Sequence, residues 1–237
     1  TVLLYDTDKD AVAAAEGPDA GVKRVTGHHM LYGGVLDGSN YTRVHEVHVC
    51  GLAASTSYHY KVGAPGAWSA VYNVSTGPAV GSTEPYSFAV TGDSRDEPAI
   101  FAQIQEKLVS RGVDFQIFTG DAVSIGNKQT DWNKWFEASN MGFTVQDALA
   151  RIPFMPSNGN HENFAINYVA QFAVPQHVGK GELGGGEEYY SFDYASAHFV
   201  ALNDTPPAGA DFASQLTWLK DDLAKVDRAK TPFIFVF

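Results

Sequence analysis

The stretch Ile152-Pro-Phe-Met-Pro-Ser-Asn-Gly-Asn-His-Glu162 joins a short apolar run to a polar turn. The run predicts a buried strand, and the turn carries an amide, an imidazole and a carboxylate at Asn160, His161 and Glu162. Such side chains at a strand end can hold a metal ion and handle a proton beside it. On its own the triplet is weak evidence, because it also fits an ordinary polar loop.

Two other apolar runs end in a carboxylate. Phe88-Ala-Val-Thr-Gly-Asp93 and Phe115-Gln-Ile-Phe-Thr-Gly-Asp121 both finish in Thr-Gly-Asp. The chain between them predicts a helix, so this segment is a strand–helix–strand unit with parallel strands. Parallel neighbours place both carboxylates at one edge of the sheet. Three strand ends that carry Asp93, Asp121 and Asn160-His161 are therefore a candidate site.

The predicted helix begins at Asp96-Glu-Pro98 and ends at Gly112, with Ile100, Ile104 and Leu108 on one face. We also expect two helical pieces over residues 132–136 and 147–150, and a hairpin with strands over 189–194 and 198–203. An amphipathic helix over 215–226 and a last strand over 231–237 follow. Together they predict a layered α/β domain.

The first 80 residues predict an all-β structure instead. Tyr41 to Val49 alternates apolar and polar side chains, as a half-buried strand does. The hydroxyl of Tyr58 can return to the backbone, as in the tyrosine corner of β-sandwiches. We expect a β-sandwich over residues 1–80, in which strand Thr1–Tyr5 lacks partners, then a linker over 81–85 and the α/β domain over 86–237.

Both halves resemble known families. The motifs His45-X-Val-X-Val-X-Gly-Leu52, Thr56-X-Tyr-X-Tyr60 and Trp68 to Thr76 resemble the second half of a fibronectin type III domain. Gly92-Asp93, Gly120-Asp121 and Gly159-Asn-His-Glu162, with the hairpin and the amphipathic helix, resemble the calcineurin-like metallophosphoesterase superfamily. The order of the two modules is similar to that of purple acid phosphatases and their bacterial relatives, with the pattern incomplete at both ends.

The resemblance implies a binuclear centre that hydrolyses phosphate monoesters by attack of a metal-bound hydroxide. Asp93 would bind the first of two divalent ions, Asp121 would bridge both, and Asn160 would bind the second. The ions would be Fe, Mn or Zn, and a bridging carboxylate suits a pair about 3.5–4 Å apart. His161 would face the phosphoryl group as a catalytic residue, and Glu162 would orient His161.

Three departures from the family pattern matter. Arg95 stands where many members place a metal-binding His, and we expect it to contact the substrate phosphate, because its planar fork suits phosphate oxygens. Ser124 stands where purple acid phosphatases place an iron-binding Tyr. The further family ligands, a His and a Gly-His-X-His turn, would follow Phe237. We therefore expect residues 1–237 alone to be inactive and a missing part of the protein, or a second chain, to complete the site.

Composition excludes some partners and leaves the compartment open. The net charge of −11 and the absence of a Lys and Arg cluster argue against nucleic acid. No apolar stretch approaches the roughly 18 residues that span a bilayer. Three Asn-X-Ser/Thr sequons, at Asn40, Asn73 and Asn203, favour a secreted, periplasmic or cell-surface protein.

Other functions stay open at this point. A phosphodiesterase or nucleotidase of the same superfamily would carry the same site residues, and its substrate would be set by loops such as Gly179 to Glu188. A catalytically inert binding or adhesive protein would use the fibronectin-like part. A nucleotide-binding α/β domain would need a Gly-rich phosphate loop that opens a helix, which this sequence lacks.

Overall fold

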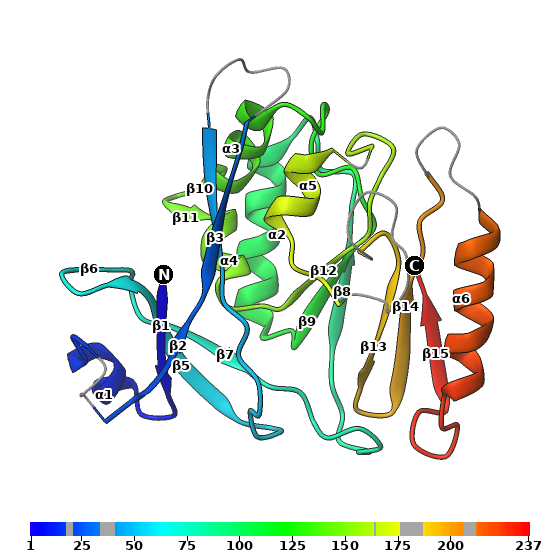
Figure 1. Cartoon of the computed structure of the whole chain (residues 1–237), viewed down its shortest axis with the longest axis horizontal. Helices are drawn as coiled ribbons and strands as arrows, with labels where there is room; N and C mark the ends of the chain where they lie inside the picture. The colour runs from blue at the N-terminus through cyan, green and yellow to red at the C-terminus, as the bar shows by residue number, and fades with distance from the viewer. Residues whose placement is uncertain (18–20, 34–40, 164, 176–186, 206–211) are drawn as a thin grey trace.

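The computed structural model describes residues 1–17, 21–33, 41–163, 165–175, 187–205 and 212–237. The first part of the chain is mostly β-structure, and the second part alternates strands and helices (Figure 1). The predicted α/β class is confirmed, but the first part is not all-β as predicted, because it contains a short helix over Lys9–Ala14. Within the described ranges no helix combines the length and the apolar character that crossing a membrane requires.

The first sheet is built around β1 (Val2–Asp6), which lies between β2 (Lys23–Thr26) and β5 (Ser57–Ala64) and is antiparallel to both. The expectation that this first strand lacks partners is wrong, because β2 and β5 cover its two edges. The remaining elements of this sheet region are β6 (Ala67–Trp68) and β7 (Tyr72–Ser75), which pair with β5, and helix α1 (Lys9–Ala14). Leu4 and Val12 are fully buried in one cluster between α1 and the sheet.

A second pair of strands, β3 (His28–Gly33) and β4 (Tyr41–Glu46), forms an antiparallel ladder beside the first sheet. The strand predicted to run from Tyr41 to Val49 thus ends at Glu46. The predicted tyrosine corner is present, since the backbone N–H of Ala53 donates to the hydroxyl of Tyr58 at 3.0 Å. This bond fixes the turn that leads into β5.

The second half begins with a parallel sheet in the order β12 (Phe154–Pro156), β9 (Phe115–Phe118) and β8 (Phe88–Thr91). Helix α2 (Pro98–Arg111) connects β8 to β9 and ends at Gly112, whose left-handed backbone (φ 66°) lets its N–H cap the helix. The predicted strand–helix–strand unit and its helix boundaries are therefore confirmed.

The face of α2 that packs against the protein is not the face that carries Ile100 and Ile104. Ile100 and Ile104 are 52% and 41% exposed, whereas Phe101 and Gln105 are buried. Gln105 and Gln116 of β9 exchange two side-chain hydrogen bonds of 2.9 and 2.8 Å. Because a buried amide is costly unless it is paired, this exchange turns Gln105 inward and leaves the isoleucines at the surface.

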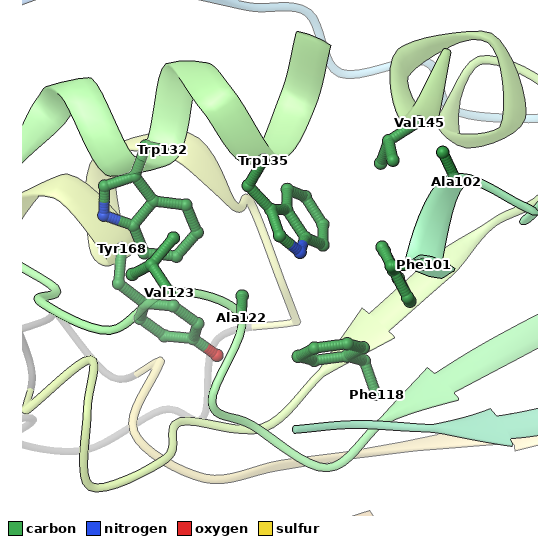
Figure 2. Packing of buried hydrophobic residues seen from close by; sticks show 9 residues of the cluster. All are labelled: Phe101, Ala102, Phe118, Ala122, Val123, Trp132, Trp135, Val145 and Tyr168. Atoms are coloured by element: carbon green, nitrogen blue, oxygen red, sulfur yellow. The ribbon is translucent and has the colours of Figure 1, made fainter. Parts of the chain in front are cut away.

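Three short helices and a small hairpin complete the layer on this side of the sheet: α3 (Gln129–Glu137), β10 (Ser139–Asn140), β11 (Phe143–Thr144), α4 (Val145–Leu149) and α5 (Ile166–Gln171). Figure 2 shows Trp132 and Trp135 projecting from α3 into the main core. There Trp135 stacks on Phe101 of α2 with ring centroids 5.2 Å apart and meets Phe118 of β9 edge-on. The aromatic cluster anchors α3 next to the carboxyl end of β9.

The chain then forms a second three-stranded sheet, with β13 (Tyr190–Tyr194), β14 (Ala197–Ala201) and β15 (Phe233–Val236), and helix α6 (Phe212–Lys225) on its outer face (Figure 1). The predicted hairpin, helix and last strand are confirmed. The two sheets meet through aromatic rings, of which Phe88 and Phe115 each contact Phe199 with centroids 5.2 Å apart. The result is a helix–sheet–sheet–helix arrangement.

The β-rich part is joined to the helical layer by polar contacts. The hydroxyl of Tyr32 on β3 donates to Gln129 at the start of α3, at 2.7 Å, and the hydroxyl of Tyr60 on β5 donates to the carbonyl of Ala150 at 2.7 Å. The guanidinium of Arg151 lies 4.9 Å from the ring centroid of Tyr72. The first part of the chain thus supports the helices that border the candidate site.

Candidate functional site

The first two site residues lie in matching turns at the carboxyl edge of the parallel sheet. Asp93 follows β8 and Asp121 follows β9, and both have left-handed backbone, with φ values of 51° and 60°. The Asp93 N–H donates to the carbonyl of Gly120 at 2.9 Å, and the Ser94 N–H donates to the carbonyl of Asp121 at 3.0 Å. Left-handed backbone costs an L residue about 1 kcal/mol, so these bonds hold both carboxylates in turns that would otherwise relax.

Glycines allow the third turn to approach the second. A Cβ on Gly120 would lie 2.7 Å from the Cα of Gly159, and a Cβ on Gly159 would lie 2.2 Å from Oδ1 of Asp121. No other residue fits at either position without a shift of the backbone. The approach lets the backbone N–H of His161 donate to Oδ1 of Asp121 at 3.1 Å. The structure therefore brings the turns of Asp93, Asp121 and His161 together, as the sequence predicts.

Glu162 holds these turns from within the protein. Its buried carboxylate accepts the backbone N–H groups of Asp121 and Ala122, both at 2.8 Å, of Gly159 at 2.9 Å and of Val123 at 3.3 Å. Burial raises the pKa of this carboxyl, while the backbone donors act in the opposite direction. The prediction that Glu162 orients His161 is wrong, because its carboxylate is taken up by backbone amides.

The imidazole of His161 is oriented by a backbone carbonyl instead. Its Nδ1 lies 2.8 Å from the carbonyl oxygen of Ser124. A carbonyl can only accept, so Nδ1 carries the proton in this contact and Nε2 stays available for another partner. His161 lines a pocket of about 300 Å³ together with Asn160, which is exposed at the same turn.

Helix α3 supports the turns from the other side. The indole N–H of Trp132 donates to the carbonyl of Gly126 at 2.7 Å, and the N–H of Gly126 donates to the carbonyl of His161 at 2.9 Å. The indole N–H of Trp135 donates to the hydroxyl of Ser94 at 2.9 Å. Sequence reasoning missed these supports, since a tryptophan in a helix pattern signals only a core position.

Arg95 lies between the two carboxylates. Its Nε is 3.1 Å from Oδ1 of Asp93, and its Nη1 is 3.1 Å from Oδ2 of Asp121. The predicted contact with a substrate phosphate is not tested by this arrangement. The structure shows Arg95 paired with the carboxylates of the candidate ligands Asp93 and Asp121.

The carboxylate pair fits a positive ion. Asp93 and Asp121 already converge on one cationic group, carboxylate and amide oxygens suit Mn ions, and Zn also binds Asp oxygens. No group of three or more His, Cys, Asp or Glu side chains is arranged to hold a metal among the residues that the structure describes. Asp93, Asp121 and Asn160, which lies on the third turn, stay candidate ligands.

A comparison with models of protein families shows which family the chain belongs to. The family model described as calcineurin-like phosphoesterase matches residues 86–237, which are more than half of the chain. The chain belongs to the calcineurin-like phosphoesterase family. The matched residues include all three turns that meet at the candidate site.

The relatives of this phosphoesterase chain include plant phosphatases. Purple acid phosphatase 22 of Arabidopsis thaliana is 30% identical over 203 residues, which are 82% of this chain and 43% of that protein. A phosphoenolpyruvate phosphatase of Allium cepa is 26% identical over 249 residues, which cover 99% of this chain and 49% of that protein. The chain thus spans less than half of the length of either relative.

Solved structures show the same fold. A purple acid phosphatase from seeds of yellow lupin (Lupinus luteus) superposes with a TM-score of 0.73 at 17% identity, over 99% of this chain and 45% of that one. PhoD superposes with a TM-score of 0.51 at 13% identity, over 99% of this chain and 54% of that one. Both the β-rich part and the phosphoesterase part are included in the first match.

Ser124 and His198 also make contacts in the structure. The hydroxyl of Ser124 donates to Oδ1 of Asp96 at 2.6 Å, and its carbonyl holds His161. His198 lies on β14 with one ring nitrogen 2.7 Å from Asp193 and the other 2.8 Å from Asp222 of α6. It joins the hairpin to α6.

Proposed function

We propose that the protein is a metal-dependent phosphoesterase that hydrolyses phosphate monoesters. The observation that carries this proposal is the convergence of Asp93 and Asp121, from neighbouring parallel strands, on one cationic group. Family membership and the names of the relatives support the same reaction class. A bound pair of divalent ions would supply an activated water and positive charge for displacement at phosphorus.

In this proposal the role of each metal ligand depends on the turn on which it lies. Asp93 would hold the first ion, Asp121 would be shared, and Asn160 would hold the second, with Fe, Mn or Zn as the ions. Three protein ligands are too few for two ions, because each takes about four to six. We therefore propose that further ligands come from a part of the protein outside residues 1–237 or from a second chain.

His161 is the proposed catalytic side chain. Its Nδ1–H is held by the carbonyl of Ser124, so Nε2 is the nitrogen that, in the imidazolium form, would donate to a phosphoryl oxygen or pass its proton to the leaving group. The His161 backbone N–H, which donates to Asp121, keeps the ring near the shared ligand. Arg95 is the second proposed phosphate contact, and it reaches a phosphate only after it leaves the two carboxylates.

The test compares substrates and variants in the same assay. The protein, loaded with Mn, Zn or Fe, is given an aryl phosphate monoester, the matching diester and a nucleotide. We expect the monoester to be the best substrate and Asp121→Asn or Asp93→Ala to lower turnover at least about a hundredfold. Asp227→Asn, an exposed carboxylate next to β15, is the matched control. Faster turnover of the diester would overturn the monoester assignment, and an Asp121→Asn activity within tenfold of wild type would overturn the site.

We also propose a secreted, periplasmic or cell-surface location. Asn73 is exposed on β7 and can accept a glycan, whereas Asn203 is buried and accepts bonds from Thr205, and Asn40 lies outside the described residues. Of the two described sequons, only Asn73 is accessible. Expression in a glycosylating host should give a glycosidase-sensitive mass shift that Asn73→Gln removes; an unchanged shift in that variant would contradict the assignment of the glycan to Asn73.

A further inference from the structure

Arg95 uses the same carboxylate oxygens that a metal ion would need. On Asp121, Oδ1 accepts the backbone N–H of His161, and Oδ2 is the oxygen that contacts Nη1 of Arg95 at 3.1 Å. On Asp93, Oδ1 contacts Nε of Arg95 at 3.1 Å. The planar guanidinium thus spans the two turns, one nitrogen to each carboxylate.

Arg95 joins a carboxylate that is largely buried, on Asp121, to one that is 70% exposed, on Asp93. The side chain of Asp121 is only 15% exposed and that of Arg95 is 29% exposed, so their attraction is screened by water less than that of a surface pair. Without a cation between them, two carboxylates held in tied turns would repel each other. Arg95 therefore stabilises the converged position of both side chains.

We propose that Arg95 is an internal cation that holds Asp93 and Asp121 together in the metal-free protein and is displaced when a divalent ion binds. The inference rests on the proposed metal-dependent function. Metal uptake then becomes an exchange of one cation for another, because a divalent ion on Oδ2 of Asp121 would repel the guanidinium that contacts the same oxygen.

The structure contains a place for the displaced side chain. Arg95 borders a second pocket of about 250 Å³, which is also lined by Asp96, Ser124 and Asp131. Nε of Arg95 already lies 3.9 Å from Oδ2 of Asp96. A modest rotation of the side chain would exchange the ligand carboxylates for the carboxylate of Asp96.

The proposed exchange predicts that removal of Arg95 has opposite effects on the stability of the metal-free protein and on the affinity for the metal ion. With Arg95 removed, the metal-free protein loses its paired cation and becomes less stable. The same change removes the competitor of the metal ion, so the ion binds more tightly. A residue that only caps helix α2 or only binds substrate would not strengthen metal binding when it is removed.

The first measurement is calorimetric titration of the metal-free protein with Mn²⁺ or Zn²⁺. We expect Arg95→Gln to lower the dissociation constant about tenfold, since the competing ion pair is absent, and Arg95→Lys to fall between the two because one ammonium cannot span both carboxylates. Lys134→Gln is the control: it removes a positive charge from the same pocket, and its partner is Asp131 rather than the ligands. Thermal unfolding in the presence of a chelator should show a lower midpoint for Arg95→Gln than for Lys134→Gln.

The second measurement follows the Arg95 side chain in the wild-type protein by its NMR signal. The Nε–H resonance of Arg95, identified by its loss in Arg95→Lys, should shift when diamagnetic Zn²⁺ is added. Unchanged or weaker metal binding in Arg95→Gln, or an unmoved Nε–H resonance in zinc-loaded protein, would overturn the exchange alone. Failure of wild type to bind either ion at a site sensitive to Asp121→Asn would overturn the proposed function as well.

Discussion

The carboxylate of Glu162 accepts the backbone N–H of Asp121 at 2.8 Å, so a buried side chain on the third turn fixes the backbone of a candidate ligand on the second. Glu162→Gln would replace one accepting oxygen with an amide NH2 donor that faces backbone N–H groups. We expect a loss of about 3 kcal/mol in the free energy of unfolding, measured by urea denaturation, with turnover lost in parallel.

Glu97→Gln is the control for Glu162, since Glu97 is an exposed carboxylate at the start of α2. It should keep wild-type stability. A Glu162→Gln protein with wild-type stability and turnover would contradict the role given to the buried carboxylate.

His161→Ala should lower the maximal rate by roughly 10²–10⁴-fold if the imidazole transfers a proton. Steady-state kinetics on an aryl phosphate would measure this, with His28→Ala, an exposed histidine on β3, as the control. A change confined to KM would instead make His161 a residue that only binds the phosphate.

Protein loaded with ferric iron should lack the visible absorption band of an iron-bound tyrosinate. Ser124 stands in the place of the iron-binding tyrosine, and the hydroxyl of Tyr190 is engaged elsewhere, with a 2.8 Å bond to the carbonyl of Pro156. Burial also raises the pKa of Tyr190, which opposes its ionisation. Ser124→Ala should leave the spectrum unchanged, and a tyrosinate band in either protein would show that another tyrosine reaches the iron.

Tyr60 makes stability depend on alkaline pH. Burial raises its pKa from 10.0 to about 12, so within this range the folded protein keeps a proton that the unfolded chain loses. The free energy of unfolding therefore falls as the pH rises through the window. Tyr60→Phe should lose about 1 kcal/mol at neutral pH, with its bond to Ala150, and decline less steeply above pH 10 in urea unfolding. Tyr41→Phe, on the exposed part of β4, should decline as wild type does.

The sequence predicted those features that depend on strand ends and periodicity. Asp93 and Asp121 came to one edge because consecutive strands joined by a helix are parallel, and the boundary of α2 at Gly112 followed from a residue that tolerates left-handed backbone. Their roles as metal ligands stay predictions.

The features that the sequence did not predict depend on partners distant along the chain. The inward turn of Gln105 needs Gln116, and the position of Arg95 needs both carboxylates at once. Glu162 looked like a partner for the adjacent imidazole, but three of the four backbone amides that it binds come from the turn after β9, 39 to 41 residues earlier. Local pattern carries no information about such contacts.

The bond from Tyr32 to Gln129 makes the helical layer beside the candidate site depend on the N-terminal β-structure. Gln129 also accepts the side-chain N–H of Asn167 at 2.8 Å, and its own amide donates to Asn133 and Gln171. A gene fusion that exchanged this module for another would have to supply a hydroxyl at the position of Tyr32, or Oε1 of Gln129 would keep only its bond from Asn167. Successful domain shuffling should therefore preserve β3 together with α3 and α5.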